Sequence, residues 1–148
     1  MVDLEPITIL LVEDDPADQK LIRTSLLDQK IANDLHIVGS GEEALDYLSE
    51  CVRKNNGTPW PELILLDLNM PGMGGKEFLR QLKEDERLKQ LPVVILTTSE
   101  SERDIIDSYN LQASGYVNKP VTLDDFKRVM EQIGEYWLML CKRPPKPE

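Results

Sequence analysis

The chain of 148 residues has the length of one domain with a substantial apolar core, and its formal net charge of −10 disfavours binding to the phosphate backbone of nucleic acid. The N-terminal residues lack the features of a secretory signal, and no stretch approaches the roughly 18 apolar residues of a membrane span. Cys51 and Cys141 belong to no metal motif, so we expect a cytoplasmic protein with reduced thiols.

The first predicted strand ends at three acids. Residues 7–12 are apolar and largely β-branched, which predicts a buried strand. Asp15 stands directly before a proline, and this pair is typical of a helix N-cap followed by the first helical residue. Glu13 and Asp14 have no such local task. The helix that begins here, over about residues 16–29, has one apolar face that we expect to pack on a sheet.

A second strand and helix follow. Residues 35–38 form the predicted strand, and the capping box from Ser40 to Glu43 begins the helix. His36 has no second histidine or cysteine nearby in sequence, so we interpret it as an ordinary strand residue rather than a metal ligand. The stretch 53–61 is rich in asparagine, glycine and proline, and it predicts a surface loop.

The third predicted strand ends at a carboxylate. The apolar run 63–66 stops at Asp67, and Pro71 and Gly72 follow in a turn. In an open parallel sheet such a residue lies at the carboxyl edge, where ligands and chemistry collect. Asp67 is therefore our candidate reactive group. Taken alone, Asp67 is better interpreted as a residue that merely ends a strand, and the residues that follow the other strands reverse this preference.

Two more strands also end in polar side chains. Residues 92–96 are continuously apolar, as central parallel strands are, and they lead into Thr97. Residues 115–118 lead into Lys119. Between these strands, a second capping box at Ser99 predicts the start of a fourth helix.

Five strand–helix repeats predict an α/β fold. Parallel strands need crossover connections, which are right-handed, so the sheet has five parallel strands with helices on both faces. All the carboxyl ends then lie along one edge of the sheet. The polar residues that follow the strands would meet there: Glu13, Asp14, Asp67, Thr97 and Lys119. This convergence favours a functional site over a chance distribution of acids.

With these residues the chain resembles the receiver domain of two-component response regulators. The resemblance rests on the spacing of Asp67, Thr97 and Lys119, on the acid pair after the first strand, and on the Met-Pro-Gly sequence after the third. It implies a flavodoxin-like, doubly wound (βα)5 receiver fold with strand order 2-1-3-4-5, in which the first and third strands are neighbours.

The resemblance also implies a phosphoacceptor switch rather than an enzyme. Asp67 would take a phosphoryl group from a sensor histidine kinase in a Mg²⁺-dependent reaction. Asp14, Asp67 and the backbone carbonyl of Asn69 would ligate the metal, and Glu13 would act mainly through water. Lys119 would neutralise the phosphoryl oxygens.

The same resemblance assigns a conformational switch to two further residues. Thr97 would turn its hydroxyl onto a phosphoryl oxygen, and Tyr116 would fill the space that Thr97 leaves. A charge-assisted hydrogen bond contributes about 1.5 to 3 kcal/mol, which is comparable to the free-energy gap between two conformers. Thr98 departs from many receivers, which have alanine at this position.

The last predicted helix is longer than the sheet it covers. It begins after Thr122, and apolar residues at helical spacing continue for about 20 residues, or roughly 30 Å. We expect its end to carry an apolar patch that contacts a second copy or another partner, in preference to folding back on its own body. The predicted contact residues are Phe126, Ile133, Trp137 and Leu140. The receiver domain would span residues 1–141, and 142–148 would be a flexible, Pro-rich basic tail.

This ending and the segment Leu96–Ser99 also resemble the stand-alone response regulators associated with bacterial phytochromes, which implies a light-sensing kinase as partner. Three other classes fit less well. An aspartyl phosphatase would need an acid where Asn69 stands, and a flavin-binding protein would need a Ser/Thr-rich loop where the acids 13–15 stand. A binding module that has lost phosphorylation is disfavoured because every required residue is present.

Overall fold

The computed structural model describes residues 7–29, 33–53, 57–98, 105, 107, 109–120 and 122–135. The strands are β1 (Ile7–Val12), β2 (Asn33–Val38), β3 (Leu63–Leu66), β4 (Val93–Thr97) and β5 (Gly115–Asn118). The helices are α1 (Pro16–Leu27), α2 (Gly41–Val52), α3 (Gly75–Glu84) and α5 (Leu123–Ile133). Ile105, Asp107, Tyr109 and Asn110 are helical as well, and the predicted helix start at Ser99 lies outside the described residues.

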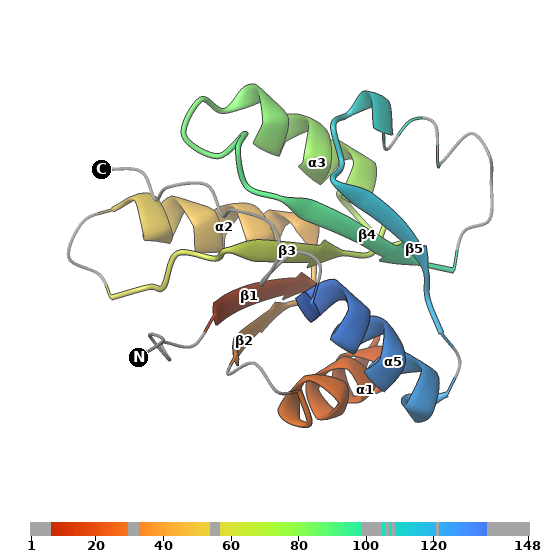
Figure 1. Cartoon of the computed structure of the whole chain (residues 1–148). Helices are drawn as coiled ribbons and strands as arrows, with labels where there is room; N and C mark the ends of the chain where they lie inside the picture. The colour runs from red at the N-terminus through yellow and green to blue at the C-terminus, as the bar shows by residue number, and fades with distance from the viewer. Residues whose placement is uncertain are drawn as a thin grey trace.

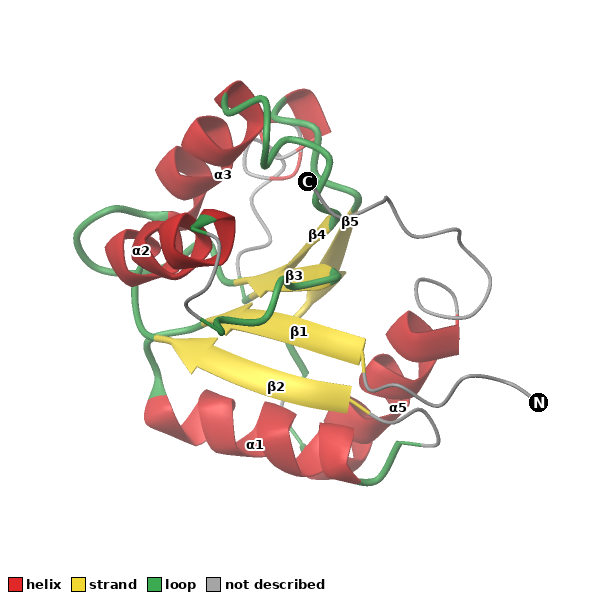
Figure 2. Ribbon diagram, turned by 90° about the vertical axis from the view of Figure 1, so that its left-hand side faces the viewer, coloured by secondary structure: helices red, strands yellow, loops and turns green. Residues whose placement is uncertain are grey.

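The strands form a parallel sheet in the order β2-β1-β3-β4-β5, which confirms the predicted doubly wound, flavodoxin-like fold. Helices α1 and α5 lie on one face of the sheet, and α2 and α3 lie on the other (Figures 1 and 2). β1, β3 and β4 are the inner strands and are buried along their whole length. Cover on both faces explains why these strands are continuous apolar runs in the sequence.

Predicted boundaries differ from the structure at β2, at α1 and at β4, which spans Val93–Thr97 rather than residues 92–96. β2 begins at Asn33 rather than Leu35, because it pairs with β1 from Ile7↔Asn33 onward. Its first two residues, Asn33 and Asp34, are polar, so they carry no apolar signal for a strand. α1 ends at Leu27 and its C-cap is Asp28, slightly earlier than predicted.

The predicted helix starts at Asp15, Ser40 and Thr122 are confirmed by hydrogen bonds at the N-caps. Asp15 Oδ1 accepts from Ala17 N at 2.9 Å, and Ser40 Oγ accepts from Glu43 N at 3.1 Å. Thr122 Oγ1 accepts from Asp125 N at 3.2 Å. Each cap satisfies a backbone N–H group that has no partner within its helix.

The apolar core has two parts, one on each face of the sheet. Leu10 and Val12 of β1 belong to the part beneath α2 and α3, whereas Ile9 and Leu11 belong to the part beneath α1 and α5. This division follows from the alternation of side chains along a strand. The sheet therefore holds its carboxyl edge between two packed layers.

The structure corrects one part of the predicted contact surface. Phe126 is 0% exposed and Ile133 is 7% exposed, and both belong to the core beneath α1 and α5. Their helical spacing turns them toward the sheet of their own chain, so they are core residues and not contacts for a partner. Trp137 and Leu140 lie outside the described residues.

Candidate functional site

The three predicted acids meet at the carboxyl edge of the sheet. Val12 pairs with Leu66, so β1 and β3 end at the same level, and Glu13 and Asp67 follow them directly. Asp67 N–H also donates to the carbonyl of Val12 at 3.0 Å. Carboxylate oxygens of Glu13, Asp14 and Asp67 all lie within 4.8 Å of one another. Glu13 and Asp67 are buried, and Asp14 is the most accessible of the three.

Lys119 brings a cation to these acids from β5. Its backbone N–H donates to the carbonyl of Thr97 at 2.8 Å, which fixes the chain where β5 ends. The ammonium Nζ donates to Asp67 Oδ2 at 3.2 Å, to Asp18 Oδ2 at 3.0 Å and to Glu13 Oε1. The Lys119 side chain is only 5% exposed. Three carboxylates therefore bond one buried ammonium, and Asp14 lies beside two of them in the acid cluster.

Burial and charge shift two pKa values in the site. Burial raises the pKa of Glu13 to about 7, and the neighbouring Asp67 charge adds to this effect against the opposing hydrogen bonds from Lys119 and Asp15 N–H. For Lys119, burial lowers the pKa, but the hydrogen bonds to Glu13 and Asp18 outweigh it and raise the pKa above its ordinary value. Lys119 thus stays charged, while Glu13 keeps its proton to a higher pH than an ordinary glutamate does.

The Glu13 shift predicts a pH-dependent stability of the metal-free protein. Between the ordinary pKa of 4.5 and the folded-state value of about 7, the folded chain keeps a proton that the unfolded chain has lost. The free energy of unfolding therefore falls as pH rises through this window. We expect urea unfolding in EDTA to show lower stability at pH 8 than at pH 5.5, and Glu13→Gln to flatten this decline. Glu131→Gln, at an exposed acid of α5, is the matched control and should keep the decline.

Asn69 links the acids to Thr97. Its backbone N–H donates to Asp67 Oδ1 at 3.1 Å, and its side-chain Nδ2 donates to Thr97 Oγ1 at 3.1 Å. Thr97 is fully buried at the end of β4. Tyr116 on β5 is half-buried and packs against the core beneath α2 and α3. Thr97 therefore lies next to the site, and Asn69 connects it to Asp67 by hydrogen bonds.

The loop after β3 depends on two glycines. Gly72 has φ +72°, a conformation that disfavours side chains. At Gly75, an added Cβ would lie 2.5 Å from the carbonyl oxygen of Asp67 and 2.7 Å from Leu68 Cα. From the other side, Glu42 Oε1 of α2 accepts from Met73 N at 3.0 Å. The first turn of α3 therefore packs directly on the backbone of the candidate reactive residue.

Two features of the site carried little signal in the sequence. Asp18 is an ordinary first-turn acid of α1 in the sequence, and no local pattern indicates that it reaches the site. Glu42 is a first-turn acid of α2 in the sequence, and nothing local predicts that it reaches Met73. His36 lies away from the acids: it pairs with Asp34 at 2.9 Å and its ring contacts Tyr47, as expected for a strand residue.

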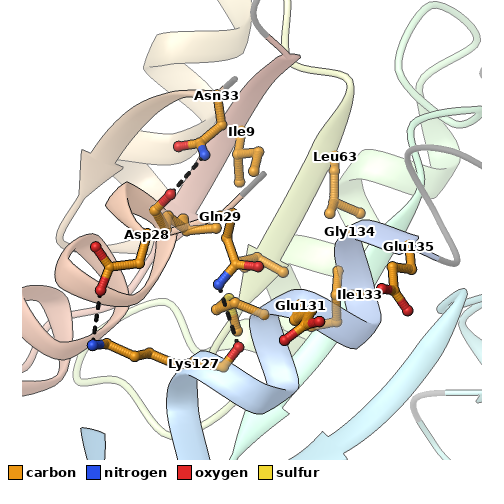
Figure 3. Close-up of a pocket in the computed structure, with 13 residues that line it drawn as sticks. Ile9, Asp28, Gln29, Asn33, Leu63, Lys127, Glu131, Ile133, Gly134 and Glu135 are labelled. Carbon is orange, nitrogen blue, oxygen red and sulfur yellow. Dashed lines mark hydrogen bonds and ion pairs between the residues drawn. The ribbon is translucent and has the colours of Figure 1, made fainter. Parts of the chain in front are cut away.

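A separate cavity of about 230 Å³ lies between α1 and α5 (Figure 3). Its floor includes Ile9 and Leu63, which pair near the amino ends of β1 and β3. Its rim holds the ion pair of Asp28 and Lys127 at 2.8 Å, and Glu135, which follows shortly after the end of α5. The acid cluster lies at the opposite end of these strands, so this cavity takes no part in its chemistry.

No helix in the described part of the chain is long and apolar enough to cross a membrane.

Comparison with known families matches residues 9–131 to the response regulator receiver domain. The chain belongs to this family. Rcp1 of Synechocystis sp. is 41% identical over 94% of this chain and 94% of its own length, and the probable methanogenesis regulatory protein FilR2 of Methanothrix harundinacea is 40% identical over 95% and 89%.

Solved structures agree with this assignment. The phosphorylated cyanobacterial phytochrome response regulator RcpA superposes with a TM-score of 0.87 at 37% identity, over 95% of this chain and all of that one. The Mn²⁺-bound form of Rcp1 superposes with a TM-score of 0.84 at 38% identity, over 95% and 100%. The predicted relationship to phytochrome response regulators is thereby confirmed for this receiver domain.

Proposed function

We propose that this receiver domain accepts a phosphoryl group on Asp67 from a sensor histidine kinase, in a Mg²⁺-dependent reaction, and thereby changes its contacts with other proteins. The single observation that carries the proposal is the acid cluster: oxygens of Glu13, Asp14 and Asp67 within 4.8 Å of one another, with the Lys119 ammonium 3.2 Å from Asp67.

The donor set fits a hard divalent cation. Mg²⁺ prefers oxygen ligands and is held in proteins by one or two carboxylates together with waters and phosphate oxygens. Three carboxylates lie within 4.8 Å of one another, and burial raises the pKa of Glu13 to about 7, with a smaller contribution from the Asp67 charge. Asp14, Asp67 and the carbonyl of Asn69 would hold the ion, with Glu13 through water. The bound ion would offset the charge of the carboxylates and of the phosphoryl oxygens.

The chain's own groups then account for the transfer. A carboxylate oxygen of Asp67 forms a bond to phosphorus while the bond from phosphorus to the donor histidine breaks, which gives an acyl phosphate. Lys119 places its ammonium beside the equatorial oxygens, where charge must be stabilised. No side chain is required as a general base, because Asp67 is a carboxylate that has no proton to lose.

The switch would begin at Thr97. Its Oγ1 now accepts a hydrogen bond from Asn69, and rotation onto a phosphoryl oxygen would exchange this bond for a charge-assisted one. Tyr116, which is half-buried on the adjacent strand, would move into the space left behind. The similarity to RcpA and Rcp1 supports a kinase of the phytochrome type as the upstream partner.

We also propose a homodimer through the region of β5 and the last helix, with a receiver domain of residues 1–141 and a separate tail of 142–148. The predicted contacts Trp137 and Leu140 follow the end of α5 in sequence. That end borders the cavity of Figure 3, whose floor is apolar. An apolar sequence that continues the chain from the end of α5 supports an interface in this region.

Intact-mass spectrometry with acetyl phosphate tests the proposed function. We expect one phosphoryl adduct that forms with Mg²⁺ and does not form in EDTA, and reduction with borohydride followed by peptide mapping should place it at Asp67. Sedimentation velocity before and after labelling would show whether association changes. A folded protein without an adduct would contradict the phosphoacceptor role, and continuous release of phosphate over many turnovers would favour a phosphatase.

A further inference from the structure

Lys119 has a carboxylate partner that lies outside the acid cluster. Its Nζ atom is 3.0 Å from Asp18 Oδ2, on the first turn of α1. The Asp18 side chain is 23% exposed. Together with Glu13 and Asp67, Asp18 gives each of the three N–H bonds of the ammonium its own carboxylate.

Helix stabilisation alone does not explain the direction of this side chain. An acid in the first turn of a helix is stabilised by the helix dipole even when it points to solvent. Asp124, in the first turn of α5, is such a residue and is exposed. Asp18 instead turns inward to bond a lysine that lies 101 residues away in sequence. The contact of Asp18 with Lys119 therefore indicates a role in the site.

The role of Asp18 follows from the competition between a bound cation and Lys119 for the carboxylates of Glu13 and Asp67. A lysine side chain has a flexible stem, so the ammonium remains where its partners hold it. A divalent cation in the acid cluster attracts the oxygens of Glu13 and Asp67 and repels the ammonium. Asp18 is not a member of the cluster, so its carboxylate continues to bind Lys119 when the other two are engaged.

We propose that Asp18 is a positioning residue for phosphoryl transfer, which keeps the Lys119 ammonium beside Asp67 while the acid cluster holds a cation. The inference rests on the proposed function, because that function places Lys119 at the phosphoryl oxygens. Asp18 acts here as a hydrogen-bond acceptor. Asparagine lacks the charge but keeps an acceptor of the same shape, whereas alanine lacks both. A comparison of the two variants therefore distinguishes positioning by a hydrogen bond from an effect of charge alone.

The test compares Asp18→Ala with Asp18→Asn in labelling by acetyl phosphate at saturating Mg²⁺. Loss of one hydrogen bond to a charged, partly exposed group should slow the alanine variant about fivefold. The asparagine variant should stay within about twofold of the native rate, since its amide oxygen still accepts from the ammonium. Asp124→Ala removes a first-turn acid that does not touch the site, and it should label at the native rate.

A second measurement reads the position of Lys119 without phosphorylation. In protein saturated with Mg²⁺ and without a phosphodonor, the ¹⁵N signal of the Lys119 ammonium should exchange slowly with water in the native chain and in Asp18→Asn, and should broaden in Asp18→Ala. Native rates in both variants, or equal changes in both, would overturn the proposal. If the native chain takes no phosphoryl group, the proposed function fails, while the ¹⁵N signal still decides whether Asp18 holds Lys119.

Discussion

Asp67→Asn is expected to abolish phosphoryl labelling while leaving a folded protein that is more stable than the native chain without metal. Asparagine keeps the shape and the acceptor for the N–H of Asn69, but its amide oxygen does not form an acyl phosphate. The Asp67 charge contributes to the raised pKa of Glu13, so its removal also relieves repulsion between two buried acids. Intact mass after treatment with acetyl phosphate and urea unfolding in EDTA measure the two effects.

Asp46→Asn is the matched control, because Asp46 is an exposed acid of α2 outside the cluster. This variant should label and unfold like the native chain. Added Mg²⁺ should raise the free energy of unfolding of the control more than that of Asp67→Asn, which has one carboxylate fewer in the cluster. An adduct of undiminished yield in Asp67→Asn would mean that another carboxylate, with Asp14 the nearest candidate, accepts the phosphoryl group.

Gly75→Ala is expected to destabilise the fold by about 3 kcal/mol, since the new methyl group meets backbone that has no room to move. The clash involves the Asp67 carbonyl oxygen at 2.5 Å and Leu68 Cα at 2.7 Å. The first turn of α3 must shift away from the site, so slower labelling should accompany the loss of stability. Urea unfolding gives the free energy, and intact mass gives the labelling rate.

Gly74→Ser provides the comparison one residue earlier. A Cβ at Gly74 would approach the carbonyl oxygen of Leu68 only to 3.8 Å, an ordinary contact. Gly74 is the N-cap of α3 and makes no side-chain hydrogen bond, so serine should be neutral or stabilise the helix by roughly 0.3 kcal/mol. Equal stability of Gly75→Ala and Gly74→Ser would show that the close approach at Gly75 is absent.

The fold and the centre of the site were predictable because they depend on local patterns. Continuous apolar runs identify inner strands, and each polar residue directly after such a run must lie at the same sheet edge. Glu13 and Asp67 were placed by this rule alone, and the structure brings their carboxylates together. Thr97 and Lys119 follow the same rule at β4 and β5.

Contacts that join distant parts of the chain were harder to predict from the sequence. Asp18 had a sufficient local explanation as a first-turn acid, so nothing in the sequence required it to reach Lys119. Gly75 looked like one more residue of a Gly-rich turn, although its backbone approach to Asp67 is a tertiary feature. The prediction of Phe126 as a partner contact was wrong for another reason. Apolar spacing identifies one face of a helix, but it does not say whether the sheet or a partner covers that face.

The two hydrogen bonds of Asn69 connect the chemistry of the site to the rest of the domain. One holds Asp67 and the other holds Thr97, so the two residues are thermodynamically linked. Linkage is reciprocal: if phosphorylation favours one arrangement of Thr97, a protein that binds this arrangement favours the phosphorylated state by the same free energy. Under the proposed function, the downstream partner is therefore itself an effector, and its concentration helps to set the fraction of the receiver that carries the phosphoryl group.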